Sequence, residues 1–180
     1  MTDVIEPTDA AADDAYARAA AITLASTDAK WLARAIELAT LNVANAGGPF
    51  GAVIVRDGEL IAEGQNRVTA SLDPTAHAEV TAIRAACQVV KDFSLAGATL
   101  YTSCEPCPLC LSAALWARID RVVFAANRDD AAAGGFDDRE FYELFARPRE
   151  TWDVSIEALR PDNASEPFDA WLASEARTDY

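Results

Sequence analysis

Apolar and polar positions follow two different periods along this chain. Between residues 31 and 43, apolar side chains recur at the three- and four-residue spacing of an amphipathic helix, which the Gly-Gly-Pro sequence at 47–49 would end. Residues 52–55 are uniformly apolar, the Asp-Gly pair at 57–58 is typical of a tight two-residue turn, and residues 60–64 suit a returning strand. This stretch therefore predicts a helix followed by a β-hairpin.

The remainder of the pattern alternates helices with strands. Asp73 suits a helix N-cap and Pro74 the first helical position, and an apolar stripe continues to about Val90. Further strands are predicted at residues 98–102, 121–126 and 151–159, and further helices at residues 106–117, at 139–145 and from about 166. This order places helices on both faces of a sheet that contains one antiparallel hairpin. We therefore expect a three-layer α/β/α sandwich with a central mixed sheet of about five strands.

Length and composition indicate one main domain. A chain of 180 residues with 51% hydrophobic content can bury one substantial core but is short for two. We assign this domain to residues 29–180. Residues 1–28 are rich in alanine and aspartate and have few large apolar side chains, which favours a loosely packed or disordered acidic extension.

The excess of acidic residues argues against two classes of partner. With 29 acidic and 15 basic residues, the formal net charge is -14, so the average surface repels phosphate backbones and anionic lipid. We therefore expect neither nucleic acid nor membrane as a partner. Acidic residues stand where a secretory signal would be cationic, which favours a cytoplasmic location.

Four cysteines, three of them within residues 104–110, are spaced like a metal site rather than a disulfide framework. His77 and Glu79 form a His-x-Glu sequence, and a Pro-Cys-x-x-Cys sequence follows, a combination that is the signature of zinc deaminases. Cys107 and Cys110 lie three residues apart, so both sulfurs leave one face of a helix near its N-terminus, where thiolates are favoured. We predict that His77, Cys107 and Cys110 hold one Zn²⁺ per subunit with a fourth position for water, and that Glu79 accepts and returns a proton.

Each half of this motif has other interpretations. A Cys-x-x-Cys pair alone also occurs in redox motifs and structural zinc knuckles, and Cys87 together with the cysteines of 104–110 could ligate an iron–sulfur cluster. Such a cluster leaves the His-x-Glu sequence unexplained. Because His77 is the only histidine in the chain, we favour catalytic zinc and treat Cys87 and Cys104 as small buried thiols.

Several sequences around these residues are similar to a known family. The segments GGPFGAVIV, AEGQN, DPTAHAEVTAIR and LYTSCEPCPLC resemble the cytidine-deaminase-like superfamily. The sequence AGGFDD, which ends in Asp138, and the final residue Tyr180 narrow the resemblance to the bacterial guanine deaminases, over about residues 31–180. The resemblance implies hydrolysis of guanine to xanthine and ammonia, with Asp138 as a second proton carrier. Without the resemblance, Asp138 would first be interpreted as an acid favoured at a helix N-terminus.

The resemblance also implies a pocket and a partner. It assigns Asn66, Phe50, the backbone of Ala78 and Tyr180 to the binding of a small purine base, with a simple turn residue as the alternative for Asn66. It implies a homodimer in which the C-terminal segment crosses to the partner, so that Tyr180 serves the neighbouring site. The open alternatives are deamination of guanosine, cytosine or ammeline, a tRNA adenosine deaminase that the acidic charge opposes, and a non-catalytic zinc-stabilised binding module.

Overall fold

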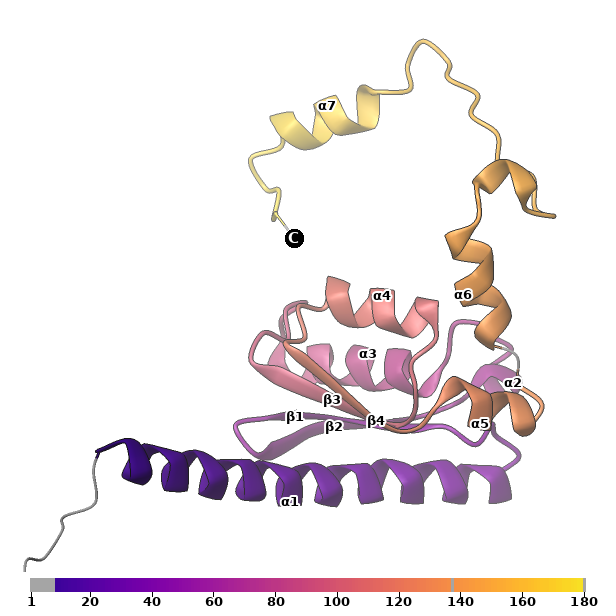
Figure 1. Cartoon of the computed structure of the whole chain (residues 1–180). Helices are drawn as coiled ribbons and strands as arrows, with labels where there is room; N and C mark the ends of the chain where they lie inside the picture. Colours follow the sequence, from indigo (N-terminus) through magenta and orange to yellow (C-terminus); the bar gives the residue numbers. More distant parts are fainter. Residues whose placement is uncertain (1–8, 137, 180) are drawn as a thin grey trace, which may run out of the picture. The chain divides into compact units, whose positions relative to one another are not determined.

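Helices and strands alternate along the chain, as the sequence pattern predicts. The computed structural model describes residues 9–136 and 138–179 (Figure 1). The elements are, in order, α1 (Asp9–Ala44), β1 (Gly51–Arg56), β2 (Glu59–Gln65), α2 (Val68–Ser71), α3 (Ala78–Val90), β3 (Ala98–Cys104), α4 (Pro108–Trp116), β4 (Arg121–Ala126), α5 (Arg128–Ala133), α6 (Asp138–Ala146), the 3₁₀ helix η1 (Arg149–Thr151) and α7 (Glu166–Ala173). Contacts divide the chain into two units, one up to Arg139 and one from Glu140 onward. Along the described residues, no helix has both the length and the apolar composition needed to span a bilayer.

The central sheet is mixed, with the strand order β2-β1-β3-β4. β1 pairs antiparallel with both β2 and β3, whereas β3 and β4 are parallel. The turn between β1 and β2 has positive φ at Asp57 (54°) and at Gly58 (80°), as a two-residue turn of type I′ requires. Because α1 covers one face of the sheet and α3 and α4 the other, the predicted three-layer α/β/α sandwich is confirmed (Figure 1).

Alternation along β1 divides its side chains between two cores. Val53 and Val55 pack against Trp31 and Leu38 of α1. Ile54, which lies between them, points to the opposite face and joins a larger core with α3 and α4. Since burial of apolar surface is the main stabilising contribution to a fold, these two cores fix both helix layers against the sheet.

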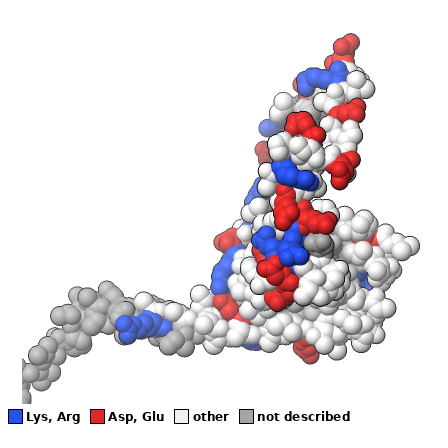
Figure 2. Space-filling model, turned by 45° about the vertical axis from the view of Figure 1, so that its right-hand side comes forward, with Lys and Arg blue, Asp and Glu red and all other residues white. Residues whose placement is uncertain are grey.

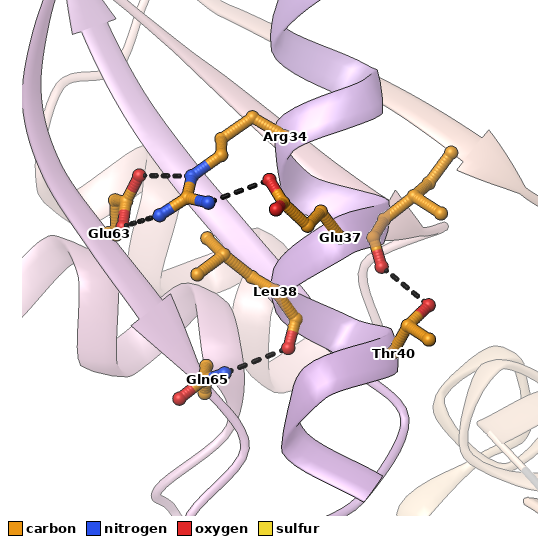
Figure 3. A network of polar contacts seen from close by, with 7 residues as sticks. Arg34, Glu37, Leu38, Thr40, Glu63 and Gln65 are labelled. Carbon is orange, nitrogen blue, oxygen red and sulfur yellow. Dashed lines mark hydrogen bonds and ion pairs between the residues drawn. The ribbon is translucent and has the colours of Figure 1, made fainter. Parts of the chain in front are cut away.

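Polar contacts additionally connect α1 to the edge strand β2 (Figure 3). Arg34 donates two hydrogen bonds to the Glu63 carboxylate, at 2.6 and 2.8 Å, and a third to Glu37 at 2.7 Å. The Gln65 side-chain amide donates to the carbonyl oxygen of Leu38 at 2.8 Å. β2 is therefore held by the helix as well as by its pairing with β1.

The helix before the hairpin is longer than the apolar pattern predicts. α1 starts at Asp9, within the segment whose composition favours loose packing or disorder, and residues 1–8 of that segment lie outside the described residues. Alanine has the highest intrinsic helix propensity, so an alanine-rich segment can be helical while burying little apolar surface. Asp28 accepts one hydrogen bond from Tyr101 at 2.8 Å and two from Arg121 at 2.8 and 2.6 Å, which fixes this part of α1 to β3 and β4.

The expected fifth strand is not formed. Residues 152–159 follow η1 without pairing to any strand in the described part of the chain, so the sheet has four strands rather than about five. The alternation of Trp152, Val154 and Ile156 indicates which side chains one face of a strand would bury, but a strand is stable only beside a neighbouring strand. Val154 and Ile156 are exposed accordingly.

Candidate active site

The first residues of two helices on the same face of the sheet carry predicted metal ligands. His77 is the N-cap residue of α3, and Cys107 is the N-cap residue of α4, with Pro108 in the first helical position. Both helices begin later than the sequence predicts. Asp73 does not cap α3 but forms a local turn, in which its Oδ1 atom accepts hydrogen bonds from the Thr75 N–H (2.8 Å) and hydroxyl (2.7 Å).

His77, Cys107 and Cys110 converge at the spacing of a tetrahedral zinc site. The Nδ1 atom of His77 lies 3.6 Å from the Cys107 sulfur and 3.5 Å from the Cys110 sulfur, and the two sulfurs are 3.7 Å apart. Tetrahedral coordination with Zn–S bonds of about 2.3 Å and Zn–N bonds of about 2.05 Å requires separations of about 3.8 Å between sulfurs and about 3.6 Å between sulfur and nitrogen. The three ligand atoms therefore fit a single zinc ion without rearrangement.

The two buried thiols are electrostatically coupled. The hydrogen bond between the two sulfur atoms lowers the pKa of Cys107 to about 4. The same contact, together with burial, raises the pKa of Cys110. A cation beside both sulfurs favours the thiolate form of each. The pair that shares one proton in the metal-free chain thus becomes a ligand set of two thiolates.

The donor set favours zinc over an iron–sulfur cluster. One imidazole and two thiolates leave a fourth tetrahedral position open, which is the arrangement of catalytic zinc. Cys104 lies apart from this group, and its sulfur donates to the carbonyl oxygen of Asn127 at 3.5 Å. The Cys87 sulfur donates to the carbonyl oxygen of Phe93 at 3.8 Å. The four cysteines therefore do not converge on one cluster.

Glu79 is a buried carboxylic acid beside the metal ligands. It lies in the first turn of α3, and its Oε1 atom accepts a hydrogen bond from the Thr102 hydroxyl at 3.3 Å. Only 5% of its surface is exposed, and this burial raises the pKa of Glu79 above the ordinary value of a carboxylic acid. A carboxyl group with a raised pKa can both accept and return a proton near neutral pH.

A cavity of about 420 Å³ opens onto Glu79, His77 and Cys107. This volume suits a small-molecule site. Phe50 and Asn66, both predicted to bind the substrate, line its wall. Ala78 is the fully buried first residue of α3 and is not among the described residues that line the cavity. The structure therefore brings the predicted metal ligands, Glu79, Phe50 and Asn66 to one site.

Comparison with known proteins shows which family has this arrangement. The family model for the cytidine and deoxycytidylate deaminase zinc-binding region matches residues 25–126, a range that contains the metal ligands and Glu79. The guanine deaminase of Bacillus subtilis is 50% identical over 151 residues, which cover 83% of this chain and 97% of that protein. This chain belongs to the cytidine and deoxycytidylate deaminase family. The protein is therefore a zinc-dependent hydrolytic deaminase, and its His77, Cys107 and Cys110 group could hold the zinc ion.

Further matches include solved guanine deaminase structures and a deaminase named for another substrate. The solved structure of the Bacillus subtilis guanine deaminase matches with a TM-score of 0.81 over 84% of this chain and 97% of that one. A guanine deaminase from Nitrosomonas europaea, 31% identical, matches with a TM-score of 0.58 over 78% of this chain and 70% of that one. A tRNA-specific adenosine deaminase of Buchnera aphidicola is 35% identical over 117 residues, which cover 65% of this chain and 78% of that protein.

Phe136 and Glu105 are among the cavity residues of this deaminase that were not predicted. Phe136 packs edge-to-face against Phe50, with ring centroids 4.8 Å apart. It precedes Asp138 in the AGGFDD sequence, so the motif that suggested Asp138 as a site residue could also have suggested Phe136. Glu105, next to the Pro-Cys-x-x-Cys sequence, forms an ion pair with Arg128 at the start of α5. Hydrogen bonds from Arg128 hold the pKa of Glu105 below its usual range. Glu105 is therefore an ionised carboxylate whose negative charge is balanced by Arg128.

Two predicted residues cannot be placed in the cavity. Asp138 is the first residue of α6, and its side chain lies outside the described residues. Tyr180 likewise lies beyond the part of the chain that the structure describes. Their roles in this deaminase stay predictions.

Proposed function

We propose that this protein catalyses the hydrolysis of guanine to xanthine and ammonia. The observation that carries the proposal is the extent of the match to the Bacillus subtilis guanine deaminase, which is 50% identical and aligned over 97% of its length. In support, a zinc site, a buried carboxyl group and a cavity of suitable size converge in this chain. In the net reaction, water adds at C2 of the ring and the amino group leaves as ammonia.

Glu79 is the proposed proton carrier of this reaction. Zinc, when bound, supplies Lewis-acid activation of water. Glu79 moves two protons in turn, the first from the attacking water to the ring nitrogen beside C2 and the second from the added hydroxyl to the amino group. The C2 carbonyl then forms as the C–N bond breaks and ammonia leaves, and the raised pKa of Glu79 suits both transfers. Asp138 is proposed as a second proton carrier. Its place in the AGGFDD sequence supports that role.

The base is proposed to bind against Phe50 and Asn66. The Phe50 ring offers an apolar face on which a planar purine can stack, and the Asn66 amide offers both a donor and an acceptor to a base edge. The backbone of Ala78 and the side chain of Tyr180 are further proposed contacts. Phe136, in contact with Phe50, adds an apolar wall that helps to exclude water from the reacting atoms.

A panel of bases and nucleosides, monitored for ammonia, tests the substrate. We expect turnover of guanine well above that of guanosine, cytosine, ammeline and adenosine. Strong turnover of another compound in the panel, with none of guanine, would reassign the substrate while leaving the deaminase chemistry in place. No turnover of any compound by the zinc-loaded protein would instead favour the zinc-stabilised binding module.

The variant Glu79→Gln tests the proton carrier. Because the amide cannot carry the proton, kcat should fall by about 10²–10⁴-fold while the zinc content stays at one per chain. Glu63→Gln is a matched control, because Glu63 is a carboxylate of β2 that binds Arg34 of α1 (Figure 3) and is not among the described residues that line the cavity. Wild-type kcat in a zinc-loaded Glu79→Gln protein would contradict the role of Glu79.

Charge separates this proposal from a tRNA adenosine deaminase. The formal net charge is -14, and on the face shown in Figure 2 acidic side chains lie among the basic ones. A polyanionic RNA requires a basic surface. We therefore propose an enzyme without nucleic acid or membrane partners, and infer a cytoplasmic location, which its four free thiols also suit. Deamination of a tRNA anticodon stem-loop at a rate near that of guanine would overturn this part of the proposal.

We further infer a homodimer in which the C-terminal segment completes the partner's site. The exposed apolar residues Phe168 and Leu172 of α7 support a role for this segment in association. Mixing Glu79→Gln chains with chains that lack Tyr180 tests the exchange. If segments cross, a mixed dimer has one complete site, and the mixture should recover about a quarter of wild-type activity, since half of the dimers are mixed. If each Tyr180 serves its own chain, or the protein is monomeric, the mixture stays inactive.

A further inference from the structure

Asn42 is a polar residue in the last turn of α1 whose side chain is entirely buried, with 0% of its surface exposed. Its Nδ2 atom donates one hydrogen bond to the carbonyl oxygen of Gly48 and one to the carbonyl oxygen of Asn66, both at 2.8 Å. The orientation of the amide follows from these partners, because Oδ1 in the same place would face two other acceptors. One side-chain amide thus connects α1, the loop after it and the end of β2.

The residues that Asn42 binds are also bonded to each other through Phe50. The Phe50 N–H donates to the carbonyl oxygen of Gly48 at 2.8 Å, and the Asn66 N–H donates to the carbonyl oxygen of Phe50 at 3.1 Å. Together with the two bonds from Asn42, these contacts close a ring of hydrogen bonds. Gly48, Phe50 and Asn66 line the cavity, whereas Asn42 lies behind them and does not reach it.

The ring is packed without free space. A Cβ atom at Gly47 would lie 2.3 Å from Asn42 Nδ2, so only glycine fits beside the amide. A Cβ atom at Gly48 would lie 3.1 Å from Asn66 Oδ1 and 3.4 Å from Phe50 Cδ2. Asn42 Oδ1 has no hydrogen-bond partner among the described atoms, an unfavourable feature for a buried oxygen. Asn42 therefore makes both hydrogen bonds through Nδ2 while its buried Oδ1 atom has none among the described atoms.

We propose that Asn42 is a positioning residue for base binding. By holding the carbonyl groups of Gly48 and Asn66 on one amide, it fixes the distance between Phe50, on which the base stacks, and the Asn66 side chain, which binds the base edge. This inference rests on the proposed function, because it assigns Asn42 a role in binding the substrate of that site. Asn42 touches neither the zinc ligands nor Glu79, so its effect passes through Asn66 and Phe50.

The variant Asn42→Leu removes both donors at nearly constant volume. We expect kcat/KM for guanine to fall at least tenfold, mainly through KM, and the dissociation constant of the product xanthine to rise by a similar factor in calorimetry. Zinc content should be unchanged. Asn42→Asp keeps the shape of the side chain and replaces the donor by an acceptor, so it should show the same losses. If Asn42→Leu fails to fold, Asn42→Asp still tests the proposal.

Gln65→Leu is the matched control. Gln65 precedes Asn66 in the chain, and its amide donates one hydrogen bond to the carbonyl oxygen of Leu38 in α1 (Figure 3). Gln65 is not among the described residues that line the cavity. Both leucine variants should lower the melting temperature, whereas only Asn42→Leu should change KM and xanthine binding. Equal changes in KM for the two variants would show that Asn42 has only a structural role.

A double-mutant cycle separates positioning from general loss of structure. If Asn42 acts largely through Asn66, then Asn42→Leu should change kcat/KM by less than about threefold in an Asn66→Ala background, because coupled residues are not additive. A full tenfold loss in that background would overturn the proposal. The base panel with the wild-type protein tests the proposed function by itself. The double-mutant cycle tests only the role of Asn42, because it compares variants on whichever base the wild-type protein deaminates.

Discussion

Two glycines of the sheet test whether the position of α3 controls the metal site. A Cβ atom at Gly64 in β2 would lie 2.2 Å from the carbonyl oxygen of Ala78 in α3, and one at Gly51 in β1 would lie 2.4 Å from the carbonyl oxygen of Ala35 in α1. Cβ atoms essentially never approach other atoms closer than 3.0 Å. Each glycine therefore allows one helix to lie directly on the sheet, and an alanine must push that helix away.

The two alanine variants should cost similar stability and differ in activity. Both clashes are with helix backbone, which cannot rotate away, so we expect each variant to lower the free energy of unfolding by about 1–3 kcal/mol. Only Gly64→Ala displaces the residue between His77 and Glu79. Because a displacement of about 1 Å at a catalytic group can cost about 10²-fold in rate, we expect kcat to fall by about that factor in Gly64→Ala. In Gly51→Ala we expect kcat to change little, because a displacement of α1 acts on KM through Asn42 rather than on Glu79.

Urea unfolding, zinc competition with a chromophoric chelator and steady-state kinetics measure the three quantities on the same samples. We expect weaker zinc binding in Gly64→Ala, while Gly51→Ala, on the opposite face of the sheet, keeps wild-type zinc affinity. Wild-type stability, zinc affinity and kcat in Gly64→Ala would refute the idea that direct contact with β2 places the ligands. Equal losses of kcat in both variants would refute the separation between the two faces.

Three further changes test other parts of the structure. Cys107→Ser should weaken zinc binding by more than about 100-fold in the chelator assay, because it removes a ligand. Asp28→Asn should lower the free energy of unfolding at pH 7 by about 1–2 kcal/mol. Hydrogen bonds from Arg121 lower the pKa of Asp28 below 3.8. The ion pair therefore stabilises the folded state above that pH, and this stabilisation is lost as the pH falls through the folded-state pKa. In urea unfolding, the difference in free energy of unfolding between Asp28→Asn and wild type should shrink below about pH 4. Leu72, 90% exposed with φ of 52°, adopts a left-handed conformation, so Leu72→Gly should raise the melting temperature, corresponding to at most about 1 kcal/mol.

The sequence predicted those parts of the molecule that depend on local pattern. The Asp57-Gly58 turn, the buried strand before it and the His-x-Glu and Cys-x-x-Cys spacing all follow from residues close in the chain. The structure confirms the hairpin and brings His77, Cys107 and Cys110 together. Helix starts were less accurate. Asp73 satisfies its hydrogen bonds with Thr75 instead of capping α3, and a local turn of this kind competes with a helix cap for the same residue type.

The features that escaped prediction depend on contacts between distant segments. Nothing near Asn42 in the sequence indicates that its amide binds carbonyl groups of Gly48 and Asn66, 6 and 24 residues away. Phe136 joins the cavity wall only because it packs on Phe50. The expected strand at 151–159 failed for the same reason, since its apolar alternation describes a face to be buried and not the neighbour that would bury it.

The site has two halves that are held in place by different parts of the fold. The metal half consists of the first residues of α3 and α4, and its position depends on the direct contact of α3 with β2 at Gly64. The half that we propose binds the base is the Gly48, Phe50 and Asn66 wall, which depends on α1 through Asn42. Because the two halves depend on different helices, we expect a change in the proposed base-binding wall to alter which base is bound while the predicted zinc ligands and Glu79 stay in place. Deaminases with this metal motif act on different bases, and the proposed role of Asn42 implies that changes on the α1 side of the cavity alter that choice.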